Sequence, residues 1–254
     1  MKKFINPALL TVAVPVLGAI GFLLRLWTIG SGPDADGLYP TQTLAWVVLL
    51  VFSALAAAVI LLGSANLTKT GSYEHSYPKS LLGAIGCLLA AVGIFICAYK
   101  SMDPANRILD KITVILGFIS AVCMLVTGYF RFTGKKCPFL FHTVIAIFLA
   151  IRAFNRCQLW SNEPQVGIFI FSFLASLSLM LAMYQRATFD VDLGKRSKSL
   201  FWSLLSVYLC LVAVPGETEM LFYGGMALWA LTNLCNIAPV PKAPIVEAEP
   251  EVTE

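Results

Sequence analysis

Eight stretches of mostly apolar residues, each about the length of a membrane-crossing helix, constrain this chain more than any other feature. They lie at roughly 6–28, 42–63, 80–99, 112–130, 138–154, 165–185, 199–215 and 218–237. A spanning helix needs about 20 residues, with a range of about 17–25, and its backbone polar groups satisfy one another within the helix. The pattern predicts an all-α, polytopic transmembrane bundle of eight helices. Seven is the alternative count, because the fifth and seventh stretches are short.

The low content of charged residues supports this fold class. Only 13% of the 254 residues are charged, against about 25% in soluble domains, and 58% are hydrophobic. This composition excludes a soluble globular enzyme, a disordered chain and a small disulfide-stabilised secreted domain. We assign residues 1–240 to the bundle. Residues 241–254 hold four of the 14 acidic residues and are predicted to form a disordered, acidic cytoplasmic tail.

The distribution of lysine and arginine predicts the orientation of the chain. With the N-terminus in the cytoplasm, twelve basic residues fall on the inner side and six on the outer side. Cytoplasmic loops of membrane proteins carry the excess of positive charge, so both termini are predicted to be cytoplasmic. The net positive charge of residues 1–240 favours membrane lipids as partners, since it attracts anionic headgroups. No basic run with interleaved aromatic residues indicates nucleic-acid binding.

Small residues predict where helices pack closely. The segment Leu-Gly-Ala-Ile-Gly occurs at 17–21 and again at 82–86. This repeated segment indicates either two four-helix halves or a chance similarity between apolar segments. In the stretch 80–99 small residues recur every three or four positions and predict a helix contact, with Ala91 facing lipid. They are Gly83, Gly86, Ala90, Gly93 and Cys97. A second small face in 165–185 comprises Ser172, Ala175, Ser176 and Ala182.

Polar residues inside the apolar stretches are the candidate ligand-binding residues. They are Arg25, Arg152, Asn155 and Arg156, and helical spacing directs the arginines into the bundle near its outer end. Asp34 and Asp36 are the predicted ion-pair partners of Arg25 and Arg152, and Glu163, Glu217 and Glu219 supply further outer carboxylates. One interpretation is that the arginines only stabilise helix ends. The other is an outward-facing pocket for an anion, because a guanidinium group binds carboxylate or phosphate with two parallel hydrogen bonds.

His142 is the one histidine within an apolar stretch, near its cytoplasmic end. Haem held by two histidines is excluded, because the second histidine, His75, lies in a predicted loop. We expect His142 to bond a neighbouring hydroxyl or carbonyl group. Asp190 and Asp192 are expected to be surface charges that pair with Arg186, Lys195 or Arg196.

No catalytic or cofactor-binding motif is present. The sequence lacks HExxH, GxSxG, Walker A and GxGxxG patterns, and no acidic residue lies in the middle of an apolar stretch. We therefore predict no enzyme activity, no catalytic residues, no metal site and no cofactor.

Four segments carry a resemblance to a family of bacterial membrane proteins without a known activity. They are RLW…DADGLYP, AFNRCQLWS, YQRATFDVDLG and LWALTNLC. The resemblance implies eight helices and a location in the bacterial cytoplasmic membrane, and it brings no ligand or site. The predicted function is a non-catalytic assembly, sensor or scaffold protein, with a membrane-protein partner or a second copy as the open choices of partner. The alternative is a small-solute or lipid transporter with an outward-facing arginine pocket.

Overall fold

The described part of the chain contains helices and no strands. The computed structural model describes residues 7–30, 43–65, 67, 73–102, 107–160, 169–215 and 219–237. Within these ranges there are nine helices: α1 (Pro7–Gly30), α2 (Leu44–Ala65), α3 (Tyr73–Ser76), α4 (Leu81–Lys100), α5 (Ile108–Thr133), α6 (Phe139–Trp160), α7 (Ile170–Asp190), α8 (Arg196–Ala213) and α9 (Met220–Thr232). The predicted acidic tail, 241–254, lies outside the described residues.

Six of the described helices are long and apolar enough to cross a membrane: α1, α2, α4, α5, α6 and α7. The prediction of eight spanning helices therefore differs from the structure at α8 and α9. Helix α9 has 13 residues, about 20 Å at 1.5 Å per residue, which is shorter than a hydrocarbon core of about 30 Å. Helix α8 has 18 residues, several of them serines, and most of them are buried against other helices. The fifth stretch, expected to be short, forms the 22-residue helix α6.

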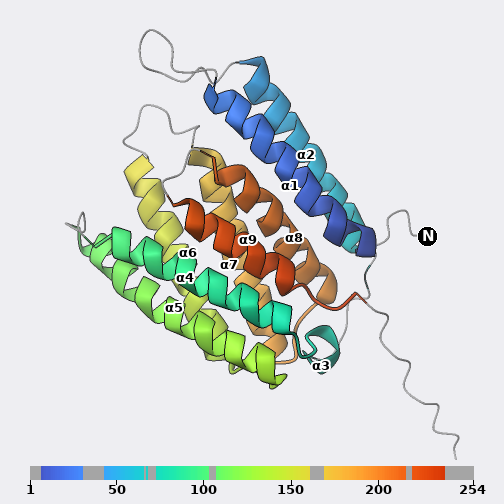
Figure 1. Ribbon diagram of the computed structural model, residues 1–254, viewed down its shortest axis with the longest axis vertical. Helices are drawn as coiled ribbons and strands as arrows, with labels where there is room; N and C mark the ends of the chain where they lie inside the picture. Colours follow the sequence, from blue (N-terminus) through green and yellow to red (C-terminus); the bar gives the residue numbers. More distant parts are fainter. Residues whose placement is uncertain are drawn as a thin grey trace, which may run out of the picture.

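Successive long helices run in alternating directions. The C-terminal ends of α1, α4, α6 and α8 therefore lie toward one side of the molecule (Figure 1). The helices do not form two four-helix halves. The hairpin of α1 and α2 packs mainly on α8, whereas α4 packs on α5 and α9. Helices α7, α8 and α9 lie between these two hairpins (Figure 1). Of the two interpretations of the repeated segment, that of two four-helix halves is wrong, because the first four long helices are split across the central layer.

The small face of α4 is a helix contact, as predicted, and its partner is α9. A Cβ atom added at Gly86 would lie 1.9 Å from Thr232 Oγ1, and one at Gly93 would lie 2.6 Å from the Leu221 carbonyl oxygen. Such distances leave no room for a side chain, so the two backbones approach closely. Ala91, expected to face lipid, is instead buried, because the interface of α4 is wider than its glycine stripe. All four small residues of the predicted α7 face are buried as well.

Local signals set the ends of several helices. Ser80 precedes α4, and its hydroxyl accepts a hydrogen bond of 3.0 Å from the Gly83 backbone N–H. Gly134 ends α5 in the left-handed region, at φ 77°, and its N–H donates to the Phe130 carbonyl oxygen. A residue with a side chain would be strained there, so glycine allows the sharp turn between α5 and α6.

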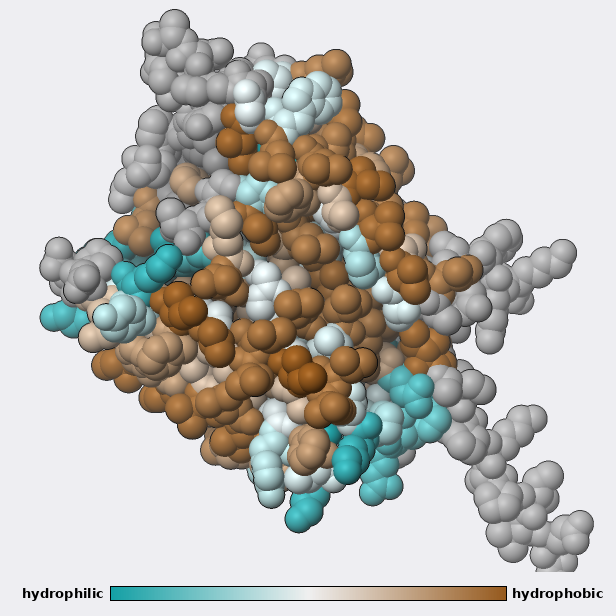
Figure 2. All heavy atoms as spheres, in the orientation of Figure 1, coloured by the Kyte–Doolittle hydropathy of each residue, from teal (hydrophilic) through white to brown (hydrophobic). Residues whose placement is uncertain are grey.

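The visible surface is divided into an apolar middle and two polar ends. Figure 2 shows hydrophobic residues over most of the face formed by α4, α5 and α9, and hydrophilic residues gathered at opposite ends of that face. Exposed leucine, isoleucine, valine and phenylalanine side chains are spread over the outer helices. An apolar surface of this extent is unusual for a protein in water and is what a hydrocarbon environment requires.

Candidate functional site

A cavity of about 300 Å³ lies where α4 ends, α5 begins and α6 passes alongside them. Its lining includes Arg152, Asn155 and Arg156, three of the four residues predicted to bind a ligand. We call it the arginine cavity. Arg152 and Arg156 are four residues apart on α6, which places both side chains on one face of the helix.

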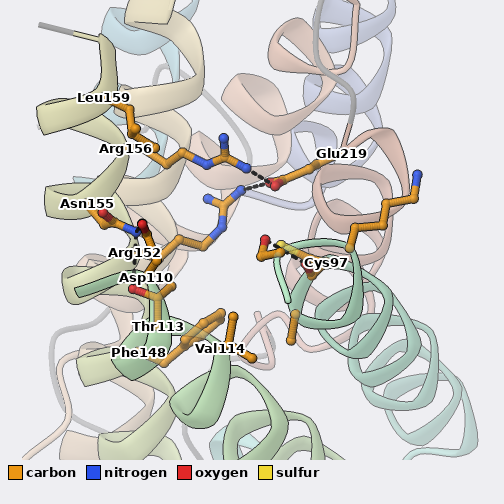
Figure 3. A pocket seen from close by; sticks show the side chains of 13 residues that line it. Cys97, Asp110, Thr113, Val114, Phe148, Arg152, Asn155, Arg156, Leu159 and Glu219 are labelled. Atoms are coloured by element: carbon orange, nitrogen blue, oxygen red, sulfur yellow. Dashed lines mark hydrogen bonds and ion pairs between the residues drawn. The ribbon is translucent and has the colours of Figure 1, made fainter. Parts of the chain in front are cut away.

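The two arginines converge on one carboxylate. Figure 3 shows Arg152 and Arg156 reaching from α6 to Glu219, which directly precedes α9. Arg152 Nη2 pairs with Glu219 Oε2 and Arg156 Nη2 pairs with Glu219 Oε1. The side chains of Arg152 and Glu219 are 3% and 5% exposed, whereas that of Arg156 is 28% exposed. Arg156 is thus the guanidinium group that is more open to a ligand.

Arg152 is further held by contacts inside the bundle. Its Nη1 donates a hydrogen bond of 3.2 Å to Ser176 Oγ, on the small face of α7. Its guanidinium carbon lies 3.9 Å from the centre of the Phe222 ring, a cation–π arrangement. Arg152 is therefore fixed by three helices and forms the rigid part of the site.

An amide and a carboxylate also line the arginine cavity. Asn155 Nδ2 donates to Asp110 Oδ1 at 2.9 Å, across the contact between α6 and α5 (Figure 3). Asp110 also accepts a hydrogen bond from Arg107 Nε at 3.2 Å, and Arg107 Nη2 donates to Asn155 Oδ1 at 3.4 Å. Asp110 is consequently occupied by its neighbours and does not neutralise the arginines across the cavity.

The charges of the described residues that line the arginine cavity do not balance. Lys100, Arg152 and Arg156 carry three positive charges, and Asp110 and Glu219 carry two negative charges. Each of the two guanidinium groups also carries five N–H donors. The wall of the cavity therefore combines an excess positive charge with hydrogen-bond donors, which suits an anion.

Arg25 lies apart from this cavity. It is buried, as predicted, and the glycine face of α1 that it shares packs on α8. Its guanidinium carbon lies 5.4 Å from the ring centre of Trp46 and 5.6 Å from that of Phe171. Arg25 is not among the residues that line the arginine cavity. Its predicted partners, Asp34 and Asp36, lie outside the described residues.

His142 forms a buried pair with an acidic residue at the opposite end of the bundle. Its Nδ1 lies 2.6 Å from Asp190 Oδ2, and the two side chains are 1% and 0% exposed. The expectation that His142 bonds a hydroxyl or carbonyl group is therefore wrong, and so is the expectation that Asp190 is a surface charge. Asp192 does behave as expected of a surface charge, although its partner is Lys136, at 2.5 Å.

Three buried arginines surround this end of the bundle. Arg186 lies over the Tyr77 ring at 3.2 Å from its centre, and Arg131 donates to Asn233 Oδ1 at 3.0 Å and to the Pro78 carbonyl oxygen at 2.6 Å. Arg196 donates to the Asn236 carbonyl oxygen. The interpretation of Arg186 and Arg196 as surface charges is wrong, because both are buried.

Sequence reasoning missed this second polar cluster. Its residues lie close to predicted loops, and charged residues near helix ends usually reach water. The one available signal was the identity of the residues in two segments that hold none of these arginines, with tyrosines at 73 and 77 and asparagines at 233 and 236. The cluster does not belong to either cavity described for the structure.

No group of three or more histidine, cysteine, aspartate or glutamate side chains that could hold a metal ion occurs within the described ranges. The candidate site is therefore the arginine cavity, whose chemistry is the binding of an anion. In comparisons with family models, curated proteins and solved structures, none matches this chain.

Proposed function

We propose that the chain is an integral membrane protein with both termini in the cytoplasm. Six helices of sufficient length and hydropathy and an apolar surface between two polar ends support membrane insertion. The excess of basic residues on one side supports the orientation. In this orientation the cluster of His142 faces the cytoplasm and the arginine cavity faces outward.

Labelling of a single cysteine tests the orientation. Lys135 lies in the exposed turn between α5 and α6, on the predicted cytoplasmic side. Lys135→Cys, made in a variant whose seven native cysteines are replaced, should react with an impermeant maleimide only after the cells are opened. Labelling in intact cells would reverse the orientation and place the arginine cavity in the cytoplasm.

We propose further that the protein is a non-catalytic membrane sensor or assembly protein that binds an anion in the arginine cavity. The observation that carries this proposal is the convergence of Arg152 and Arg156 on Glu219 at the wall of an open cavity. In this arrangement the Glu219 carboxylate occupies the position that a ligand carboxylate or phosphate would take. The excess positive charge of the described lining residues and the exposure of Arg156 favour a second anion beside it.

Calorimetry on the purified protein in detergent tests anion binding. Inorganic phosphate and acetate should bind to the wild type, and Arg156→Gln should abolish the binding of both. Arg156→Lys should weaken it, because an ammonium group cannot form the parallel pair of hydrogen bonds. Glu219→Gln should strengthen it, because it removes a competing carboxylate.

Lys111→Gln provides the matched control, since it removes one exposed positive charge of α5 that does not line the cavity. This control should bind phosphate as the wild type does. If Lys111→Gln and Arg156→Gln weaken binding equally, the effect comes from the net charge of the surface and the site is refuted.

A carrier for small anions is the second candidate function. Phe148, in the lining of the arginine cavity, is the tenth of the 22 residues of α6, so the cavity extends to about the middle of that helix. A polar cavity of that depth is typical of transporters, which bind substrate near the bilayer midplane. Uptake of radiolabelled phosphate into proteoliposomes separates the two functions, because a sensor binds the anion without moving it.

A further inference from the structure

A second cavity, of about 210 Å³, adjoins the arginine cavity on the other side of Glu219. The two cavities share Cys97, Lys100 and Glu219. The remaining lining residues of the second cavity are all apolar or glycine: Gly93, Ile96, Met220, Leu221 and Phe222. We call it the apolar cavity. A polar and an apolar space thus meet at one carboxylate.

The apolar cavity lies at the interface between α4 and α9. Met220 and Leu221 are 55% and 60% exposed. The cavity therefore adjoins the apolar outer surface, which faces the hydrocarbon in the proposed membrane protein. A ligand in it can contact the bilayer and the protein at the same time.

We propose that the two cavities form one site for an amphiphilic anion, with a phosphate or carboxylate headgroup at Arg152 and Arg156 and an alkyl chain in the apolar cavity. The inference rests on the proposed anion-binding function and names the class of its ligand. A membrane lipid and a soluble alkyl phosphate share this chemistry. A free inorganic anion uses only half of the site.

The apolar cavity predicts that an anion with an alkyl chain binds measurably more tightly than the same anion without one. Each methylene group removed from water raises affinity about fourfold. Hexyl phosphate should therefore bind the wild type at least about tenfold more tightly than inorganic phosphate does, even when only part of its chain is covered. Hexanol has the same chain without the charge and should bind weakly.

Two leucines of α9 provide a matched pair of variants. Leu221 lines the apolar cavity, whereas Leu228 is an exposed leucine on the same helix that does not. Leu221→Asn should remove most of the advantage of hexyl phosphate and leave the affinity for inorganic phosphate unchanged. Leu228→Asn should match the wild type for both ligands, which also controls for partition of hexyl phosphate into the detergent.

Calorimetry with these ligands separates the failure of this inference from that of the proposed function. Equal affinities for inorganic and hexyl phosphate would overturn the amphiphilic site and leave anion binding intact. Binding of neither ligand would overturn the proposed function and this inference with it. Hexyl phosphate binding that survives Arg156→Gln would show that the chain alone is recognised, which also overturns the site.

Native mass spectrometry identifies the source of the amphiphile. Protein reconstituted in nanodiscs with phosphatidic acid and phosphatidylcholine should retain phosphatidic acid when the ligand is a bilayer lipid. Arg156→Gln and Leu221→Asn should each lose it, and Leu228→Asn should keep it. Retention of neither lipid, together with tight binding of hexyl phosphate, assigns the site to a soluble amphiphile.

Discussion

Two adjacent glycines of α9 provide a sensitive test of the packing between α4 and α9. A Cβ atom added at Gly225 would lie 2.8 Å from the Leu89 carbonyl oxygen and 3.3 Å from the Ala90 Cα atom of α4. A Cβ atom added at Gly224 would meet nothing within 4 Å. Gly225→Ala and Gly224→Ala therefore make the same chemical change one residue apart, with and without a close helix.

The expected magnitudes follow from these distances. Alanine is favoured over glycine in a helix by about 0.8–1.0 kcal/mol, so Gly224→Ala should stabilise the protein by up to that amount. Gly225→Ala gains the same stabilisation from helix propensity. However, its methyl group would lie about 0.6 Å closer to the backbone of α4 than an ordinary contact allows, and backbone atoms cannot rotate away. Overpacking of this kind costs about 1–3 kcal/mol. The two variants should differ by about 1–3 kcal/mol, with Gly225→Ala the less stable.

Thermal unfolding in detergent, followed by circular dichroism, measures this difference. A difference of about 2 kcal/mol corresponds to about 4–8 °C in the unfolding midpoint of a chain of this size. Helix propensity cancels in the comparison, so the measured difference reports only the contact with α4. Equal midpoints for the two variants would refute a close approach of α9 to α4.

Three further predictions concern other contacts. Gly86→Leu should prevent the normal packing of α4 and lower the yield of folded protein in size-exclusion chromatography, whereas Val92→Leu, on the exposed side of the same helix, should have little effect. Asp190→Asn weakens the buried hydrogen bond between residue 190 and His142 and should lower the free energy of unfolding by about 1–3 kcal/mol, measured by chemical denaturation. Burial raises the pKa of Tyr77, which lies between α3 and α4, from 10.0 to about 12. The unfolded chain loses this proton first as the pH rises, so stability should fall between about pH 10 and pH 12, and Tyr77→Phe should remove that part of the fall.

Apolar length and residue spacing predicted the helices well. Each of the eight apolar stretches overlaps one helix, because the length of an apolar run and the residues at its ends are local properties. The small face of α4 was also predictable, since a spacing of three and four residues places side chains on one side of any helix. The number of helices long enough to cross a membrane was not predictable, because α9 ends at Thr232 although apolar residues continue beyond it.

The candidate site was predictable only in part. Arg152, Asn155 and Arg156 were selected from the sequence because polar groups in an apolar stretch are costly and rarely face lipid. The pairing of Arg152 with Glu219 joins residues 67 positions apart, and that of His142 with Asp190 joins residues 48 positions apart. No local pattern connects such pairs.

The sequence by itself determined that this chain forms long apolar helices, which of their faces carry small residues, and which polar residues lie within them. Only the tertiary structure decided that the α1–α2 and α4–α5 hairpins lie on different sides of the central helices. It also decided that Arg152 and Arg156 share Glu219 while Arg25 lies near the rings of Trp46 and Phe171. The physical reason is that helix formation depends on neighbours in the chain, whereas the burial and pairing of a charge depend on which helices pack together.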